Sequence, residues 1–205
     1  MCSISGSFSK LKLIDLCEAN KYRGQLSHSI SYYDCQTHLL TKPYKAFGPI
    51  DYNMLEEIEN NYCIVHQQAP TVEGHSEEHI HPAEYQGSCL WHNGILKQST
   101  IEKLQCENND YSGWDTKQLL IYLNKHAAPI DIDGSFACLM YINSSLYIFR
   151  NEIAPMFIDE EYNLSSTKFE GAIPIIPNQM FLLAPGKTVC DLNLEFETVT
   201  NPYKM

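Results

Sequence analysis

Cys2-Ser3-Ile4-Ser5-Gly6 opens the chain directly after Met1. Methionine before a small residue is readily removed, and its removal would leave Cys2 at the N-terminus. The α-amine of a terminal residue has a pKa of roughly 8, so it can accept the proton of its own thiol, directly or through water. N-terminal threonine enzymes use the same arrangement with a hydroxyl. The stretch therefore predicts a nucleophilic cysteine, although by itself it also fits an ordinary second residue.

A second candidate element, His92-Asn93-Gly94, follows the apolar run of residues 88–91. An Asn-Gly pair after a strand most often makes a hairpin turn. The alternative is an oxyanion hole, in which the Asn93 amide and the Gly94 backbone N–H donate to one developing negative oxygen. Each such donor contributes about 3 kcal/mol to transition-state stability. We expect a helix over 95–106 instead of a matching strand, which favours the oxyanion hole.

The rest of the pattern predicts one compact domain of mixed α and β structure with many antiparallel strands. A strand and a helix are expected within residues 3–22, and further helices at 51–60 and 115–125. The expected strands are 29–33 and 38–41 as a hairpin, then 62–66, 88–92, 135–142, 145–150, 156–158, 181–184 and 189–194.

Composition and charge exclude several classes of function. The 205 residues carry 14 Lys and Arg against 25 Asp and Glu, a net charge of -11, so binding to nucleic acid is not expected. Neither a secretory leader nor an apolar stretch of spanning length is recognisable, so no membrane partner is expected. Eight scattered cysteines without a leader indicate reduced thiols and a cytoplasmic location.

The segment His75-Ser76-Glu77-Glu78-His79-Ile80-His81 is the candidate metal site. Histidines spaced by four and by two, with carboxylates between them, could bind zinc or nickel. A solvated polar loop explains the same composition, and we prefer it. We therefore predict no metal and no cofactor.

An ordered set of motifs resembles the class II glutamine amidotransferases, the glutaminases with an N-terminal cysteine. Cys2-Ser3-Ile4-Ser5-Gly6 is similar to the opening C-G-I-x-G of that family. Further segments match in order over nearly all of the chain: Arg23-Gly24-Gln25, His66-Gln67-Gln68-Ala69-Pro70-Thr71, His92-Asn93-Gly94-Ile95-Leu96, Asp115-Thr116, Gly134-Ser135-Phe136-Ala137, and Phe149-Arg150-Asn151 followed by Pro155-Met156.

The resemblance implies an α+β fold, a four-layer αββα sandwich of two mostly antiparallel sheets of the Ntn-hydrolase (N-terminal nucleophile) type. It also implies a reaction. Cys2 would attack the side-chain amide of glutamine, giving a γ-glutamyl thioester and ammonia, and water would then release glutamate. Asn93 and Gly94 would form the oxyanion hole.

The resemblance assigns substrate-binding roles as well. Asp115 would hold the α-ammonium group of the substrate, and Thr71 would line the same end of the pocket. Gln68 stands where the family has an arginine that contacts the α-carboxylate, and the loss of that charge costs roughly 1.5–3 kcal/mol of binding. No Lys or Arg between residues 46 and 96 could replace it. Arg23 would brace the nucleophile loop, with His92 as a second supporting residue.

Three hypotheses follow for the function. The first is a stand-alone glutaminase domain, residues 1–205 without a fused synthase, that supplies ammonia to a separate acceptor or partner protein. The second is an N-terminal-cysteine amidase for another amide, for instance one without a free α-carboxylate. The third is a non-catalytic binding or regulatory subunit of the same fold.

Overall fold

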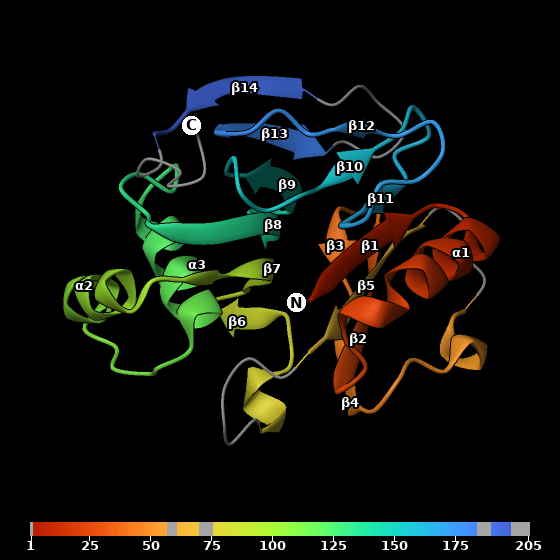
Figure 1. Ribbon diagram of the computed structural model, residues 1–205, viewed down its shortest axis with the longest axis horizontal. Helices are drawn as coiled ribbons and strands as arrows, with labels where there is room; N and C mark the ends of the chain where they lie inside the picture. The colour runs from red at the N-terminus through yellow and green to blue at the C-terminus, as the bar shows by residue number, and fades with distance from the viewer. Residues whose placement is uncertain (1, 57–60, 70–75, 184–189, 198–205) are drawn as a thin grey trace. The chain divides into compact units, whose positions relative to one another are not determined.

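The computed structural model describes residues 2–56, 61–69, 76–183 and 190–197. The chain divides into two compact units, each built on one antiparallel sheet (Figure 1). Unit 1 contains the described parts of residues 2–82 together with 156–175. Unit 2 contains residues 83–155 and the described parts of the chain from 176 onward. The expectation of a single domain stays a prediction.

The sheet of unit 1 has β1 and β5 at its centre. Its strands follow the order β12-β10-β11-β1-β5-β2-β3, and β4 also pairs with β2. Register is fixed along the central pair by Ser3 opposite Gln67 and Ser7 opposite Cys63. The strands are β1 (Ser3–Ser7), β2 (Ser27–Asp34), β3 (Leu39–Leu40), β4 (Tyr44–Phe47), β5 (Asn61–Gln68), β10 (Phe157–Ile158), β11 (Leu164–Ser165) and β12 (Ile173–Pro174).

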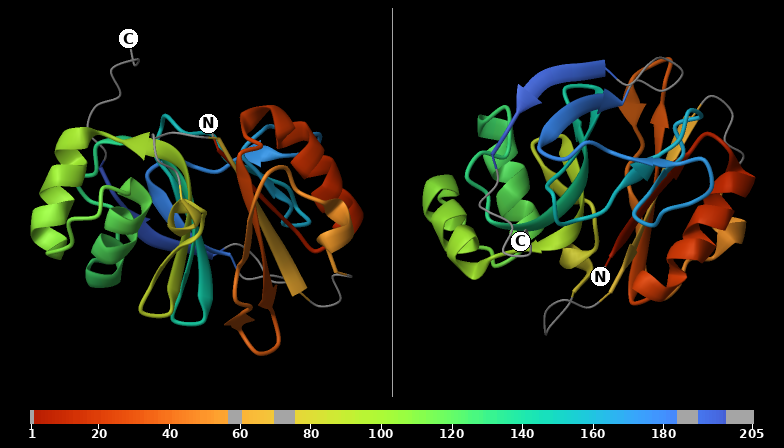
Figure 2. Two further views of the ribbon diagram at one scale, coloured as in Figure 1. Left: turned by 90° about the horizontal axis from the view of Figure 1, so that it is seen from below. Right: turned by 45° about the horizontal axis from the view of Figure 1, so that its top comes forward.

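Helix α1 (Lys10–Asn20) packs on one face of this sheet, against β1 and β5 (Figure 2). Ser9 caps its start, because the Ser9 side chain accepts a hydrogen bond from the Lys12 N–H. The helix buries Leu13 and Cys17 in an apolar cluster with Ile30, Cys63 and Val65 of the sheet. The described residues of unit 1 also form three short 3₁₀ turns: η1 (Lys21–Arg23), η2 (Tyr52–Met54) and η3 (Glu77–His79).

The sheet of unit 2 has the strand order β14-β13-β9-β8-β7-β6. Its longest pairing joins β7 to β8, from Cys89 opposite Tyr141 to Leu96 opposite Gly134. This ladder carries the His92-Asn93-Gly94 segment. The strands are β6 (Ala83–Tyr85), β7 (Ser88–Leu96), β8 (Gly134–Ile142), β9 (Ser145–Arg150), β13 (Gln179–Leu183) and β14 (Cys190–Glu195).

Two helices, α2 (Gln98–Asn108) and α3 (Asp115–Lys125), lie side by side in unit 2 (Figure 2). α3 packs directly on β6 and β7 and buries Leu119, Leu120 and Leu123 in the core of the unit. The leucines whose spacing predicted α3 therefore form the face of the helix that the sheet covers.

The loop that leads into α3 is fastened to the helix by Asp110. The Lys117 ammonium lies 3.0 Å from Asp110 Oδ2, and Gln118 Nε2 donates to Asp110 Oδ1 at 2.8 Å. Burial by itself raises the pKa of Asp110, but hydrogen bonds from Ser112 and the charge of Lys117 outweigh it and hold the pKa well below its usual range. These contacts fix the start of α3, where Asp115 lies.

We expect Asp110→Asn to lower the free energy of unfolding by about 1 kcal/mol at neutral pH. Because the folded-state pKa is depressed, the carboxylate stabilises fully above its unfolded pKa of about 4 and loses this contribution as the pH falls toward the folded value. Urea unfolding of both proteins at pH 7 and at pH 3 measures the effect. A stability difference that is the same at both pH values would contradict it.

The expected α+β class is confirmed, with two antiparallel sheets that each carry helices. The 29–33 and 38–41 hairpin is confirmed as β2 and β3, and the helix at 115–125 is confirmed as α3. The strands expected at 135–142 and 145–150 correspond to β8 and β9. β4, β6, β11 and β12 were not predicted. The last three have only two or three residues, too few to show periodicity.

The helix predicted at 51–60 is wrong over its described part. A single 3₁₀ turn forms at Tyr52–Met54, where the Asp51 side chain accepts from the Asn53 N–H, and Leu55 is already extended. Leu55 is buried in the core of unit 1, so packing of this side chain overrides the helical spacing. Residues 57–60 lie outside the described residues.

The interpretation of the segment around Asn93 also needs correction. Asn93-Gly94 forms no hairpin turn and is not followed by a helix at residue 95. Both residues lie inside β7, opposite Ala137 and Phe136, and the strand continues to Leu96 before α2 begins at Gln98. Pairing with β8 keeps the chain extended at Asn93 and Gly94. Local patterns do not show this pairing, because the partner strand lies about 40 residues further along the chain.

Candidate active site

Cys2 is buried at the start of β1, in unit 1. Its thiol lies 4.0 Å from the carbonyl oxygen of Ala69, which follows the end of β5. Arg23 is also buried, and its Nε–H donates to the carbonyl oxygen of Cys2 at 2.9 Å. The predicted brace between Arg23 and the nucleophile segment thus has a direct backbone contact.

Gly24 explains why Arg23 can reach this position. A Cβ at Gly24 would collide with the backbone of Gln68 and Ala69. The chain after η1 therefore lies against the end of β5, and the Leu26 N–H donates to the Gln68 carbonyl oxygen at 2.9 Å. Only a residue without a side chain permits this approach.

We expect Arg23→Met to lower the free energy of unfolding by about 2 kcal/mol, because it removes a charged donor from a buried carbonyl group. Lys21→Met is the matched control. Lys21 lies in the same 3₁₀ turn, but its side chain is half exposed and its ammonium lies 3.5 Å from the Glu18 carboxylate, so its removal costs little. Urea unfolding measures both variants. Equal losses in the two would contradict a bracing role for Arg23.

Gln68, predicted to bind substrate, uses its side-chain amide within unit 1. Its Nε2 donates to the His79 carbonyl oxygen at 3.0 Å, and its Oε1 accepts from Ser27 Oγ at 3.2 Å. The side chain is buried, with 2 % of its surface exposed. Gln68 thus ties β5 to β2 and to η3. Its substrate role stays a prediction, and Thr71 lies outside the described residues.

Gly94 is the position in β7 where a side chain does not fit. A Cβ there would collide with the carbonyl oxygen of Ser135 and lie 2.7 Å from His92 Nε2. Asn93 beside it is buried. The sequence predicted that these two residues present hydrogen-bond donors, and the structure places both on one strand in unit 2.

His92 and Asp115 meet at the start of α3. His92 is buried and lies 3.1 Å from Thr116 Oγ1 through Nδ1 and 3.2 Å from the Ser135 carbonyl oxygen through Nε2. Asp115 accepts hydrogen bonds from the Leu96 N–H at 3.1 Å and from the Thr116 N–H at 2.7 Å. Thr116 and Ser135 were not predicted as site residues. Their positions inside two of the quoted motifs were the available signal.

Burial excludes several other cysteines as nucleophiles. It raises the pKa of the Cys17 thiol to about 12 and raises the pKa of Cys63 and Cys138 as well. A thiol with a raised pKa stays protonated at neutral pH and is a poor nucleophile. Among the described cysteines, Cys106 is the exposed one, on α2.

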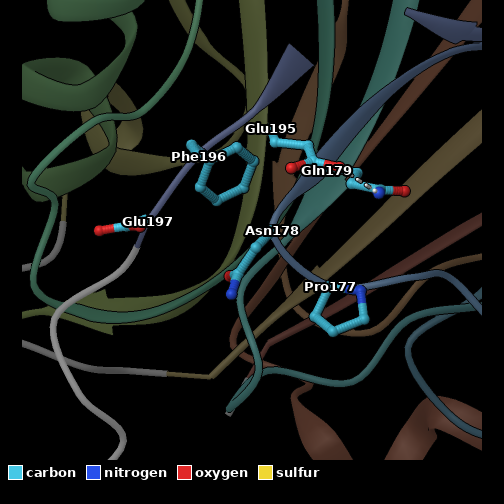
Figure 3. Close-up of a pocket in the computed structure, with 6 residues that line it drawn as sticks. All are labelled: Pro177, Asn178, Gln179, Glu195, Phe196 and Glu197. Atoms are coloured by element: carbon cyan, nitrogen blue, oxygen red, sulfur yellow. Dashed lines mark hydrogen bonds between the residues drawn. The ribbon is translucent and has the colours of Figure 1, made fainter. Parts of the chain in front are cut away.

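A pocket of about 430 Å³ lies in unit 2 (Figure 3). It is lined by Pro177, Asn178, Gln179, Glu195, Phe196 and Glu197. None of the eight predicted site residues lines it. In the part of the chain that the structure describes, no three His, Cys, Asp or Glu side chains gather as metal ligands, and no helix is long and apolar enough to cross a membrane. His75 lies outside the described residues.

Comparison with solved structures identifies the fold. The structure of glutamine phosphoribosylpyrophosphate amidotransferase from B. subtilis, in complex with ADP and GMP, superposes with a TM-score of 0.66 at 17% identity. The alignment covers 89% of this chain and 47% of that one. The chain has an Ntn-hydrolase-like, glutamine amidotransferase-like fold.

A second structure, described as the allosteric regulatory enzyme of purine biosynthesis, gives a TM-score of 0.64 at 20% identity. This alignment also covers 89% of this chain and 47% of the other one, so this chain spans about half the length of both structures. No protein-family model matches the sequence, and no curated protein matches it. The likeness is therefore one of fold.

Proposed function

We propose that this protein hydrolyses the side-chain amide of glutamine, with Cys2 as the N-terminal nucleophile. The observation that carries the proposal is the buried Cys2 thiol at the start of β1, whose backbone is held by Arg23, in a chain with a glutamine amidotransferase-like fold. The collision that any side chain at Gly94 would meet supports a second element, the oxyanion hole.

The reaction has two steps. After removal of Met1, the α-amine of Cys2 takes the thiol proton while Sγ bonds to the amide carbon. The amide side chain of Asn93 and the N–H of Gly94 donate to the negative oxygen that develops. The C–N bond then breaks. The protonated α-amine of Cys2 gives its proton to the leaving nitrogen, which departs as ammonia. Water attacks the thioester, releases glutamate and restores the thiol.

Asp115 would hold the α-ammonium group of glutamine. Its carboxylate lies in the first turn of α3, where the helix dipole favours a negative charge. Both of its oxygens already accept backbone hydrogen bonds, which fix its orientation, and 19 % of the side-chain surface remains exposed. Thr71 would line the same end of the pocket. Ammonia would pass to a separate acceptor protein in the cytoplasm.

A second candidate function is hydrolysis of an amide that has no free carboxylate. It is favoured by the contacts of Gln68, whose amide is engaged with Ser27 and His79 and carries no charge. A substrate carboxylate would gain no ion pair from this residue.

The test is a comparison of substrates with the purified protein. Glutamate and ammonia released from glutamine are measured beside the products of glutamine α-amide, in which the carboxylate is blocked. Turnover of glutamine at least tenfold above the blocked amide supports the first function. Equal or faster turnover of the blocked amide supports the second, and absence of both activities supports a non-catalytic subunit.

A further inference from the structure

One hydroxyl in unit 2 joins the two polar side chains that lie beside the Asn93–Gly94 segment. Thr116 Oγ1 is 3.1 Å from His92 Nδ1 and 3.2 Å from Asp115 Oδ1. Thr116 is fully buried, and 1 % of the His92 side-chain surface is exposed. The hydroxyl has a single proton, and in a buried site the hydrogen bond that it donates is stronger than in water.

The other edge of the imidazole faces the backbone that supports Gly94. His92 Nε2 lies 3.2 Å from the Ser135 carbonyl oxygen. A carbonyl oxygen only accepts, so Nε2 carries a proton, and the other ring nitrogen, Nδ1, faces the Thr116 hydroxyl. The same Ser135 oxygen and the same Nε2 are what a Cβ at Gly94 would meet. The imidazole therefore packs directly against Gly94.

The Ser135 backbone is held from its far side by Asn151. The Asn151 side chain donates to the Gly134 carbonyl oxygen at 2.7 Å and accepts from the Phe136 N–H at 3.3 Å. Asn151 thus holds the backbone of Gly134 and of Phe136, the residues on either side of Ser135. With this backbone held, the imidazole is the side chain that packs on Gly94, and Thr116 contacts its Nδ1 edge.

We infer that Thr116 is a positioning residue, which aligns the Gly94 N–H through His92. The inference rests on the proposed function, since it assigns Thr116 to the oxyanion hole of that reaction. Direct removal of an oxyanion donor lowers kcat about 10²–10³-fold. Misalignment of a donor that is retained costs less.

Thr116→Val separates positioning from substrate binding. Valine keeps the shape of threonine and removes the hydroxyl. Asp115 retains its hydrogen bonds from the Thr116 and Leu96 backbone N–H groups, so binding of the ammonium group is preserved. We expect kcat for glutamine to fall about tenfold while KM stays within about twofold. Thr116→Ser restores the hydroxyl and is expected to recover most of kcat.

Two controls distinguish this effect from general damage. Thr100→Val makes the same change at a buried threonine in the first turn of α2 and is expected to leave kcat unchanged. Alkylation of Cys2 by iodoacetamide needs no oxyanion hole, so its rate is expected to be equal in wild type and Thr116→Val.

The outcomes are distinct. A tenfold loss of kcat at constant KM and constant alkylation rate, recovered by serine, supports the inference. An unchanged kcat in Thr116→Val overturns it and leaves the proposed function standing. Loss of kcat together with slower alkylation also overturns it, because the change then acts on the whole fold. A wild-type protein that hydrolyses no amide overturns the proposed function and the inference with it.

Discussion

Cys2→Ala is expected to abolish amide hydrolysis, with a loss of at least about 10⁴-fold in kcat. The physical reason is that Cys2, once Met1 is removed, is the thiol whose own α-amine can take its proton. Cys17, Cys63 and Cys138 are buried with raised pKa values. The intact mass after treatment with the glutamine analogue 6-diazo-5-oxo-norleucine shows whether Met1 is removed and whether an adduct forms, and so identifies the nucleophile. Wild type should lose Met1 and gain one adduct, and Cys2→Ala should gain none.

Cys106→Ala is the control for this experiment, because Cys106 is exposed on α2 and is the natural competitor for an electrophile. It should keep both the activity and the single adduct. An adduct that depends on Cys106 instead of Cys2 would remove the basis of the mechanism. Retention of Met1 in an active protein would do the same, since the α-amine would no longer belong to Cys2.

Gly94→Ala is expected to give the second largest effect. The new methyl group must displace the Ser135 carbonyl or the His92 ring, which shifts the Gly94 N–H away from the oxyanion position. We expect kcat to fall by about 10²–10³-fold, as for loss of one oxyanion donor. Overpacking should also lower the free energy of unfolding by about 1–3 kcal/mol. Steady-state kinetics and urea unfolding measure the two effects.

Gly113→Ala is the matched control, because a Cβ at Gly113 meets nothing within 4 Å. It should change neither kcat nor stability. Asn93→Ala separates donor loss from overpacking, since it removes the side-chain donor without adding atoms and should lower kcat by a similar factor. Full activity in Gly94→Ala would show that this N–H takes no part in the reaction.

Much of the fold could be predicted from local patterns. α3 was predicted with its observed bounds, because leucines at helical spacing follow an acidic first turn. β8 and β9 were predicted to within one residue, because the turn at Asn143 and Ser144 separates two apolar runs. The opening cysteine and the ordered motifs predicted the fold class, which the solved structures confirm.

Contacts between distant residues could not be predicted in this way. Asn93-Gly94 has the local signature of a hairpin, yet pairing with Ala137 and Phe136 places it inside a strand. Leu55 belongs to a helical pattern, yet burial in the core of unit 1 extends the chain there. In both cases tertiary contacts outweigh a local preference of about 1 kcal/mol or less.

The sequence by itself determined which functional groups the protein has: the thiol of Cys2, amide and backbone donors at Asn93 and Gly94, and a carboxylate at Asp115. Only the tertiary structure decided how these groups are held. Arg23 reaches Cys2 across 21 residues, Thr116 reaches His92 across 24, and Ser135 reaches His92 across 43. Such hydrogen bonds leave no periodic trace in the sequence, because each depends on strand register and helix docking and not on neighbouring residues.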